Sequence, residues 1–551
     1  MYYQTSILMK KSLVALLLIT QIAAAQRLKK SERLTLDRLR SEITYLSSDS
    51  LQGRNTGSEG EKLAYEYLTA QFKDLGLLPK GDHQTYIQSF EIKEGKQVLP
   101  STRLSFNDQP LQEGTDFFPL AYSAAGGTEG YAAPVLQEKG VPWFWNLKDL
   151  LESNAHQPDF DLKKALLDKV HDFAGKGASA VIIYNTSRLD DGLQFDPKDP
   201  TETLPVPVVY VTRSAAEKYF RDRSATYDIS VKVAFGPKLR IGHNVIGYID
   251  NGAPTTIILG AHYDHLGHGE DHNGLWTGPP AIFHGADDNA SGTAAVIELA
   301  RMLKESRLKD HNYLFICFSG EELGLLGSKY FAAHPTIDLS SVDYMINSDM
   351  IGRLNDTTHL LTIGGYGTSP EWSRVVESRT RYLNIKFDSS GVGPSDQTSF
   401  YMKDIPVLFF FTGIHPDYHK PTDVVSRINF PGELRVIQYM IQVIEKTNRM
   451  DKLAFSKTRE PRMEGAHFTV TLGIMPDYSF SGKGVRADGI IEGKIAQKAG
   501  IRAGDVLIRL GSHDFSDIYA YMDVLSKFKK GDATTVTVMR GKQELTFPIT
   551  F

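Results

Sequence analysis

Two chemically active side chains follow one strongly apolar run of this 551-residue chain. The run TTIILGA leads into His262, and Asp264 comes after it with one residue between them. Residues i and i+2 of an extended chain point to the same side. We therefore expect the Asp264 carboxylate to accept the second imidazole N–H of His262, which fixes the tautomer of a metal-bound histidine. Taken alone, such a pair indicates a structural hydrogen bond more strongly than a metal site.

Carboxylates follow at the next two breaks in the apolar pattern. Asp288, in GADDNASG, stands at the mouth of a helical stretch, where a helix N-cap and a ligand bridging two cations are the alternatives. We favour the metal role for Asp288, whereas the two roles are equally supported for Asp287. Glu321 and Glu322 follow the run YLFICF. Because adjacent side chains diverge, we expect Glu322 to bind metal and Glu321 to face the substrate as a general base.

The remaining candidates end two further apolar runs. Asp349 lies in NSDMIG, and Tyr418 and His419 lie in DYHKPTD after the run VLFFF. His415 competes with His419 for the same role, and we favour His419.

Oxygen and imidazole donors without a thiolate suit zinc or, less selectively, manganese or cobalt. Five such ligands suit two ions that share one carboxylate. Two ions about 3.5–4 Å apart would hold a hydroxide nucleophile and polarise a carbonyl. The expected ligands are His262, Asp288 and Asp349 for one ion, and Asp288, Glu322 and His419 for the other.

The apolar runs themselves predict the fold that positions these residues. TTIILGAHYDHL, NYLFICF, DYMINS and IPVLFFF alternate with helical stretches such as SGTAAVIELARMLKE. Near-continuous apolar strands indicate a sheet covered on both faces, and sites in such sheets form beyond the carboxyl ends of the strands. We predict an α/β domain with a mixed, mostly parallel sheet over residues 26–94 and 242–450. Ser58 and Glu61 resemble a capping box at the start of one of its helices.

Three further segments differ in character. Lys10 and Lys11, an apolar stretch and the triplet Ala23–Ala25 predict a signal peptide over residues 1–25. The stretch is too short for a stable membrane anchor. We therefore expect a secreted or periplasmic protein, exported as in bacteria, with no membrane anchor after cleavage. We predict that residues 95–241 form an inserted β-rich module and that residues 463–551 form a small β-rich C-terminal domain.

Composition excludes some classes of function. Hydrophobic residues make up 41% and charged residues 23%, as in an ordinary globular protein. The net charge of -5 argues against a nucleic-acid partner. Because Cys317 is the single cysteine, the chain cannot form an intramolecular disulfide. We expect Cys317 to be a buried apolar residue.

The ordered motifs GAHYDHLG, GADDNASG, FSGEELGLLGS, NSDMIG and DYHKPTD resemble those of the co-catalytic zinc aminopeptidases of clan MH, which include bacterial leucine-type aminopeptidases and glutamate carboxypeptidase relatives. The resemblance implies two zinc ions, peptide substrates and the ligand set given above. It implies that Glu321 takes a proton from the bridging water and passes it to the leaving amine. It also implies a cis peptide bond after Asp288 and an oxyanion-stabilising hydroxyl on Tyr418.

The two other modules carry resemblances of their own. Residues 95–241 resemble a protease-associated domain, mainly through KALLDKVHDFAGKGASAVIIYN and LPVPVVYVT. The C-terminal region resembles a PDZ domain, a small β-barrel-like fold. In that family Leu472, Gly473 and Ile474 would offer backbone N–H groups to a peptide C-terminus.

Three alternatives stay open at this point. A glutaminyl cyclase shares the fold but uses one zinc, and a carboxypeptidase would need a cation such as Arg353 for the substrate carboxylate. A non-catalytic peptide-binding protein would have lost ligands or the base, whereas this chain keeps all six. The stretch 389–401, the expected wall of the specificity pocket, carries Gln397 after Asp396 instead of the commoner histidine.

Overall fold

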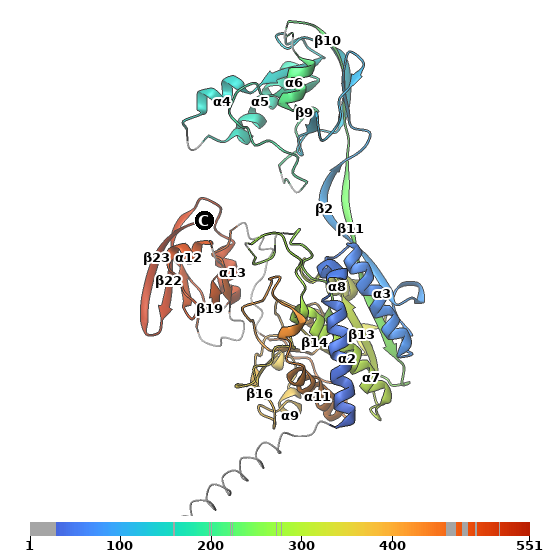
Figure 1. The fold of residues 1–551 in the computed structure, drawn as a ribbon. Helices are drawn as coiled ribbons and strands as arrows, with labels where there is room; N and C mark the ends of the chain where they lie inside the picture. Colours follow the sequence, from blue (N-terminus) through green and yellow to red (C-terminus); the bar gives the residue numbers. More distant parts are fainter. Residues whose placement is uncertain are drawn as a thin grey trace, which may run out of the picture. The chain divides into compact units, whose positions relative to one another are not determined.

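The computed structural model describes residues 29–551 except 158–159, 198, 200, 221, 223, 272, 277, 459–469, 477–482, 491–492 and 517 (Figure 1). The signal peptide predicted over residues 1–25 lies outside the described residues. Among the described helices, none is both long and apolar enough to cross a membrane. The chain divides into two compact units, Met1–Phe90 with Ile241–Phe551, and Glu91–Arg240.

A mixed, mostly parallel sheet forms the centre of the first unit, as the apolar runs predict. Its four central strands, in the order β13-β12-β14-β17, run parallel to one another. On the two sides of this block, β11 pairs antiparallel with β13 and β15 pairs antiparallel with β17. In spatial order the strands are β1 (Leu78–Pro79), β11 (Phe235–Ile249), β13 (Asn312–Phe318), β12 (Thr256–His262), β14 (Val342–Ser348), β17 (Val407–Phe411), β15 (Leu360–Gly364) and β16 (Asn384–Phe387).

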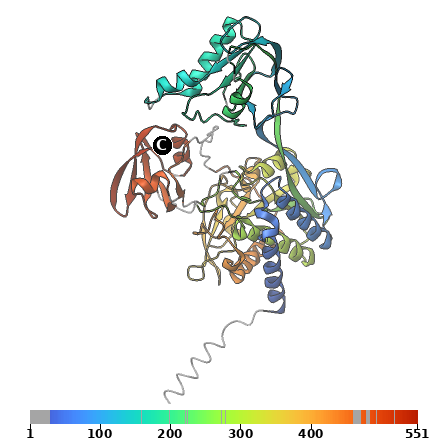
Figure 2. The same ribbon diagram turned by 45° about the horizontal axis from the view of Figure 1, so that its top comes forward.

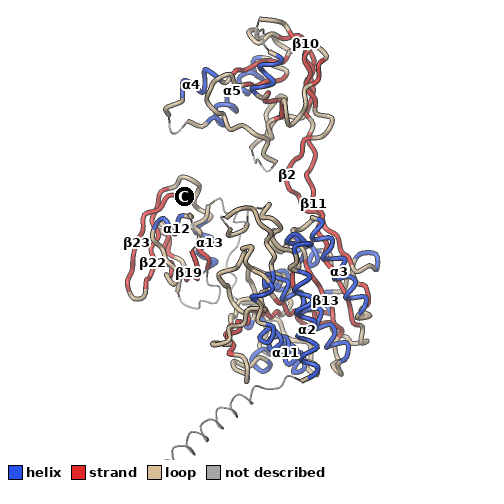
Figure 3. The backbone as a smooth tube through the Cα atoms, viewed as in Figure 1, coloured by secondary structure: helices blue, strands red, loops and turns tan. Residues whose placement is uncertain are grey.

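Helices cover both faces of this sheet, which explains why its strands are apolar throughout. Ile257 and Leu259 of β12 belong to the core cluster that holds the buried faces of α2, α3, α7 and α11. Ile258, which points to the other side, packs in a second cluster with Phe331 and Phe400. The helices are α2 (Lys30–Leu46), α3 (Glu59–Asp74), α7 (Gly292–Glu305), α8 (Leu326–Ala333), α9 (Trp372–Val375), α10 (Gln397–Tyr401) and α11 (Phe430–Thr447). Figure 3 shows α2, α3 and α11 in blue alongside the red strands.

Short helical turns complete this part of the chain. They are η1 (Asp49–Arg54), η2 (Asp82–Gln84), η3 (Ala286–Ser291), η4 (Leu339–Ser341), η5 (Tyr366–Thr368) and η6 (Val425–Arg427). Of these, η1 and η3 carry residues of the site described below.

The second unit contains two four-stranded sheets. One is antiparallel, with the order β4 (Gln109–Pro110), β3 (Arg103–Phe106), β10 (Tyr227–Val233) and β6 (Gly126–Ala132). The other is mixed, with the order β5 (Phe117–Pro119), β9 (Val208–Val211), β8 (Ala180–Tyr184) and β7 (Pro142–Asn146). Its helices are α4 (Lys148–Asn154), α5 (Leu162–Lys176) and α6 (Arg213–Tyr219). The chain enters and leaves this unit within β2 (Ile87–Val98) and β11, which pair with each other.

The C-terminal region is rich in antiparallel strands, which are red in Figure 2. They are β18 (Ile474–Pro476), β19 (Val485–Ile490), β20 (Val506–Leu510), β21 (His513–Asp514), β22 (Ala533–Arg540) and β23 (Gln543–Thr550), with helices α12 (Ile495–Ala499) and α13 (Ile518–Leu525). Leu472, Leu507 and Val536 belong to a hydrophobic core of its own.

Candidate metal centre

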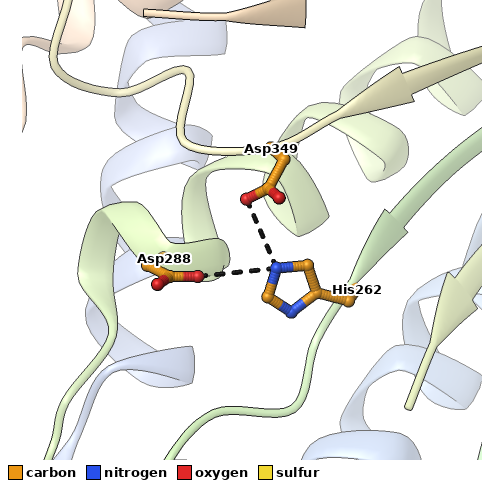
Figure 4. Close-up of side chains that lie close together, drawn as sticks. All are labelled: His262, Asp288 and Asp349. Atoms are coloured by element: carbon orange, nitrogen blue, oxygen red, sulfur yellow. Dashed lines mark hydrogen bonds and ion pairs between the residues drawn. The ribbon is translucent and has the colours of Figure 1, made fainter. Parts of the chain in front are cut away.

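Three side chains, His262, Asp288 and Asp349, converge where β12, β14 and the turn before α7 end (Figure 4). His262 Nε2 lies 3.3 Å from Asp349 Oδ1 and 3.5 Å from Asp288 Oδ1. Donor atoms around a tetrahedral ion with bonds of about 2.0–2.1 Å lie roughly 3.3 Å apart. The spacing of these three donors therefore fits one zinc-sized ion, and the three residues form a compact potential metal group.

A second set of donors shares Asp288 with the first. His419 Nε2 lies 3.2 Å from Asp288 Oδ2 and 3.2 Å from Glu322 Oε2. Asp288 thus presents one oxygen to each histidine, which is the arrangement of a bridging carboxylate. All five side chains expected as ligands lie together in this region.

One further histidine at the site was missed from the sequence. His265 Nδ1 lies 2.8 Å from Glu322 Oε1 and 4.0 Å from Asp288 Oδ2. These three residues also form a potential metal group. The first distance is that of a hydrogen bond and the second exceeds a tetrahedral donor spacing, so His265 suits a donor to Glu322 better than a ligand. The repeated histidine in HYDH was the signal for it.

Charge explains how these groups coexist in a buried site. Burial alone would lower the pKa of His262, but Asp349 and Glu321 raise it well above its ordinary value. His419 behaves in the same way, since Glu322 and Asp288 outweigh its burial and raise its pKa. The carboxylates therefore create a negative potential that favours positive charge at this site. Metal cations bound between the donors would supply that charge.

Glu321 and Glu322 are adjacent in the sequence but differ in their electrostatic surroundings. Burial raises the pKa of Glu321 well above its usual range, and His262 offsets this only in part. Burial also acts on Glu322, but His419 and His265 lower its pKa well below the usual range. The Glu321 carboxylate lies 3.9 Å from His262 Nε2 and lines the open cavity. Glu322 thus faces the donors, and Glu321 stands beside them with a raised proton affinity, as a general base needs.

Asp264 holds the site in a different way from the one expected. His262 Nδ1 contacts the backbone oxygen of Asp264 at 3.2 Å, while the Asp264 carboxylate is 3.7 Å away. That carboxylate accepts the backbone N–H groups of Glu321 and Glu322 at 3.2 and 3.4 Å. The expectation assumed an extended chain, but β12 ends at His262. The turn that follows directs the carboxylate toward the glutamates.

Asp288 is fixed by two neighbouring residues. Asp423 Oδ2 accepts the backbone N–H groups of Asp287 and Asp288 at 2.9 and 3.0 Å. The peptide bond between Asp288 and Asn289 is cis, as the family resemblance implies. Asn289 Nδ2 in turn donates to the carbonyl of Ser348, one residue before Asp349.

The structure separates Asp287 and His415 from the two donor groups. His415 Nε2 lies 3.1 Å from Asp287 Oδ2, and Asp287 Oδ1 accepts the N–H of Gly352 at 2.7 Å. The pKa of His415, which burial alone would lower, is raised by Asp287. These two residues thus form a supporting pair behind the site.

An N-terminal segment that the sequence did not single out braces the same turns. Arg54 is completely buried and donates to the carbonyls of Tyr263, His284 and Gly285 at 2.7–3.0 Å. Gly53, with φ +70, packs so closely that a Cβ would lie 2.5 Å from the carbonyl oxygens of Gly267 and Phe283. The glycines in QGRNTG were the available signal for this close approach.

Glu61 extends this brace. Ser58 caps α3 by accepting the N–H of Glu61 at 3.2 Å, as expected. The Glu61 carboxylate accepts hydrogen bonds from the N–H of Gly57 at 2.9 Å and the hydroxyl of Ser319 at 2.6 Å. It therefore ties the start of α3 to the strand end that precedes Glu321.

A cavity of about 400 Å³ opens onto both donor groups. Tyr418 lines it and stacks on His419 with ring centroids 3.8 Å apart. Arg353 instead pairs with Asp417 at 3.2 Å and is not among the lining residues. The lining consists of His262, Asp288, Glu321, Glu322, Gly324, Leu325, Lys329, Asp349, Met350, Gly393, Pro394, Phe409, Phe411, Ile414, Tyr418 and His419.

The loop expected to bind peptide C-termini lies at the start of β18. Leu472 is buried, Gly473 adopts φ 75, and Ile474 pairs with Ile490 of β19. The positive φ is the conformation that favours glycine at that position.

Two family models match the chain. Residues 244–444 match the model described as peptidase family M28, and residues 470–551 match the PDZ domain model. Both agree with resemblances inferred from the motifs.

Curated relatives carry aminopeptidase names. Aminopeptidase YwaD of Bacillus subtilis is 29% identical over 275 residues, which cover 48% of this chain and 55% of the relative. Probable lipoprotein aminopeptidase LpqL of Mycobacterium tuberculosis is 27% identical over 292 residues, which cover 46% of this chain and 54% of the relative. The chain thus spans about half the length of these relatives.

Among solved structures, the aminopeptidase from Aneurinibacillus sp. strain AM-1 aligns with a TM-score of 0.39 and 23% identity, over 77% of this chain and 95% of that one. In sequence, residues 244–444 are thus similar to peptidase family M28, and residues 470–551 are similar to the PDZ domain family.

Proposed function

We propose that this protein is a two-zinc aminopeptidase that removes the N-terminal residue from peptides. The observation that carries the proposal is the placement of Asp288, whose two oxygens face His262 and His419 separately. The M28 match and the aminopeptidase names of the relatives support it. Zinc is favoured because the donors are imidazoles and carboxylates at tetrahedral spacing.

Two zinc ions bound there would polarise the scissile carbonyl and lower the pKa of the attacking water. Glu321 accepts the proton of that water as its oxygen bonds to the carbonyl carbon. The same carboxyl group then delivers the proton to the leaving amine as the C–N bond breaks. The Tyr418 hydroxyl stabilises the oxyanion, and Asp264 positions Glu321 by holding its backbone N–H.

Metal stoichiometry and substrate blocking test this proposal together. Protein stripped with a chelator should take up two zinc ions per chain and then cleave leucine nitroanilide but not its N-acetyl derivative. Uptake of one ion with conversion of glutaminyl peptides to pyroglutamyl peptides would indicate a cyclase instead. Cleavage of N-blocked peptides from the carboxyl end would indicate a carboxypeptidase, for which Arg353 is already occupied by Asp417.

The accessory parts have proposed roles of their own. We assign residues 1–25 as a signal peptide that directs secretion or export to the periplasm, and N-terminal sequencing of the mature protein should begin at Gln26. The insert at 95–241 is proposed to be a protease-associated-like module.

The region 463–551 is proposed to bind peptide C-termini through the N–H groups of Leu472, Gly473 and Ile474. Calorimetry with a free and a C-terminally amidated peptide should show binding of the free carboxylate only.

A further inference from the structure

The cavity at the metal centre continues into a smaller hollow. Gly393, Pro394, Phe409 and Phe411 line both spaces, which therefore adjoin. The smaller hollow is also lined by Thr362, Gly364, Asp388, Ser390, Val392 and Gln397. Asp388 is the single charged side chain among these lining residues.

The strand order explains where the hollow leads. From the metal centre the sheet runs β14, β17, β15 and β16. Asp349 follows β14, and Asp388 follows β16, three strands further on. Phe409 and Phe411 of β17 stand between them and form aromatic walls.

A glycine keeps the passage over β15 open. Gly364 lies opposite Phe409 across the two strands. A Cβ at Gly364 would lie only 3.3 Å from the Phe409 side chain. The space beside this aromatic ring therefore depends on the missing side chain.

Asp388 lacks a cationic partner in the described part of the chain. Its Oδ1 accepts the N–H of Ser390 at 3.0 Å, and no arginine or lysine of the described residues forms an ion pair with it. Burial raises its pKa, and Ser390 and the more distant Lys386 offset this only in part. A carboxylate in such a place is stabilised when a cation enters.

We propose that the hollow receives the side chain of the substrate's N-terminal residue and that Asp388 selects a cationic one, lysine or arginine. The inference rests on the proposed aminopeptidase function and adds its substrate class. The apolar stem of such a side chain would lie along Phe409 and Phe411, with the charged end at Asp388.

Distances favour a long side chain. Neighbouring strands lie about 4.8 Å apart, so Asp388 is roughly 10 Å from the strand that bears Phe409 and Phe411. An extended arginine side chain spans roughly 7 Å at about 1.5 Å per bond. For a substrate backbone that lies over β17, whose Phe409 and Phe411 also line the metal-centre cavity, a charge-assisted hydrogen bond of about 2.8 Å completes that distance. A leucine side chain would end among the aromatic rings.

The test compares arginine, lysine, norleucine and leucine nitroanilides on the zinc-loaded enzyme, because norleucine has the lysine stem without its charge. We expect kcat/KM for arginine and lysine to exceed that for norleucine by about tenfold or more. Asp388→Asn should remove that preference, so that kcat/KM for arginine and lysine falls to the value for norleucine measured on the same variant. Asp404→Asn, at an exposed turn outside both cavities, is the matched control and should keep the preference.

Calorimetric binding of free arginine, norleucine and leucine separates this inference from the proposed activity. Arginine should bind the parent protein about tenfold more tightly than norleucine does. In Asp388→Asn, arginine and norleucine should bind with equal affinity. If this holds without hydrolysis of any nitroanilide, the aminopeptidase proposal fails and the cation site stands. Equal loss on all substrates, or an unchanged arginine-to-norleucine ratio in Asp388→Asn, overturns the inference.

Discussion

The hydroxyl group of Thr56 donates a hydrogen bond of 3.0 Å to Oδ2 of Asp264, a residue 208 positions away in the sequence. Asp264 also accepts the backbone N–H groups of Glu321 and Glu322. Thr56 further accepts the N–H of Gly320 at 3.1 Å. The segment before α3 therefore fixes the turn that carries both the proposed base and a proposed ligand.

Replacing Thr56 by valine should weaken the enzyme without changing its fold. Thr56→Val keeps the shape but removes the hydroxyl, so kcat should fall about 10- to 100-fold while KM changes little. The free energy of unfolding should fall by about 1–3 kcal/mol because buried partners lose a hydrogen bond. Thr56→Ser, measured alongside by steady-state kinetics and urea unfolding, should retain most of both. A valine variant with the parent kcat would contradict the positioning role.

His265 should control the second metal through its hydrogen bond to Glu322. His265→Asn places an N–H donor near the Nδ1 position, so it should keep affinity for the second zinc ion. His265→Leu lacks a donor and should bind that ion about 10- to 100-fold more weakly. Competition with a zinc chelator measures this without any reliance on turnover. Equal weakening in the two variants would instead show that the imidazole coordinates the metal.

Glu321→Gln should separate metal binding from catalysis. The amide cannot accept the proton of the attacking water, so kcat should fall about 10²–10⁴-fold. Metal content should remain two ions per chain, because Glu321 is outside both sets of proposed ligands. Metal analysis and nitroanilide kinetics on the same preparation check both points. Normal turnover by this variant would exclude Glu321 as the base.

Glu42 should make stability depend on pH. Burial, reinforced by Glu298, raises the pKa of Glu42 to about 8 in the folded state, from 4.5 without burial. The folded chain therefore binds a proton that the unfolded chain has released, and stability falls as pH rises from about 4.5 to 8.

Glu42→Gln removes this proton linkage. The variant should gain roughly 1–3 kcal/mol relative to the parent between pH 5 and pH 8. Urea unfolding at the two pH values measures the gain, with Glu66→Gln on the exposed face of α3 as control. A gain that is the same at both pH values would show that Glu42 is not the titrating group.

Much of the fold and the donor set could be read from the sequence. The apolar runs predicted the strands because both faces of the sheet are buried, as Ile257 and Ile258 show by packing in different clusters. His262 and Asp349 meet because they end neighbouring parallel strands, β12 and β14. The geometry brings together the ligand types that the motifs suggested, and their metal roles remain proposals.

Hydrogen-bond partners could not be read in the same way. The sequence suggested that Asp264 contacts the His262 ring through its carboxylate, but the turn after β12 directs that group to Thr56 and Glu321. The neighbours of Asp288 and His415 could not be read from the sequence either: Asp288 Oδ2 lies 3.2 Å from His419 Nε2, and His415 Nε2 lies 3.1 Å from Asp287 Oδ2.

By itself, the sequence determined which residue types stand at the ends of the strands, because local periodicity fixes strands and parallel strands end at one edge. Only the tertiary structure decided that Thr56, Arg54 and His265 support the site and that Asp388 closes a hollow beside it. The order in which β17, β15 and β16 lie side by side is set by long-range packing. Local sequence does not encode that order, so the same carboxylate could have been an ordinary surface charge.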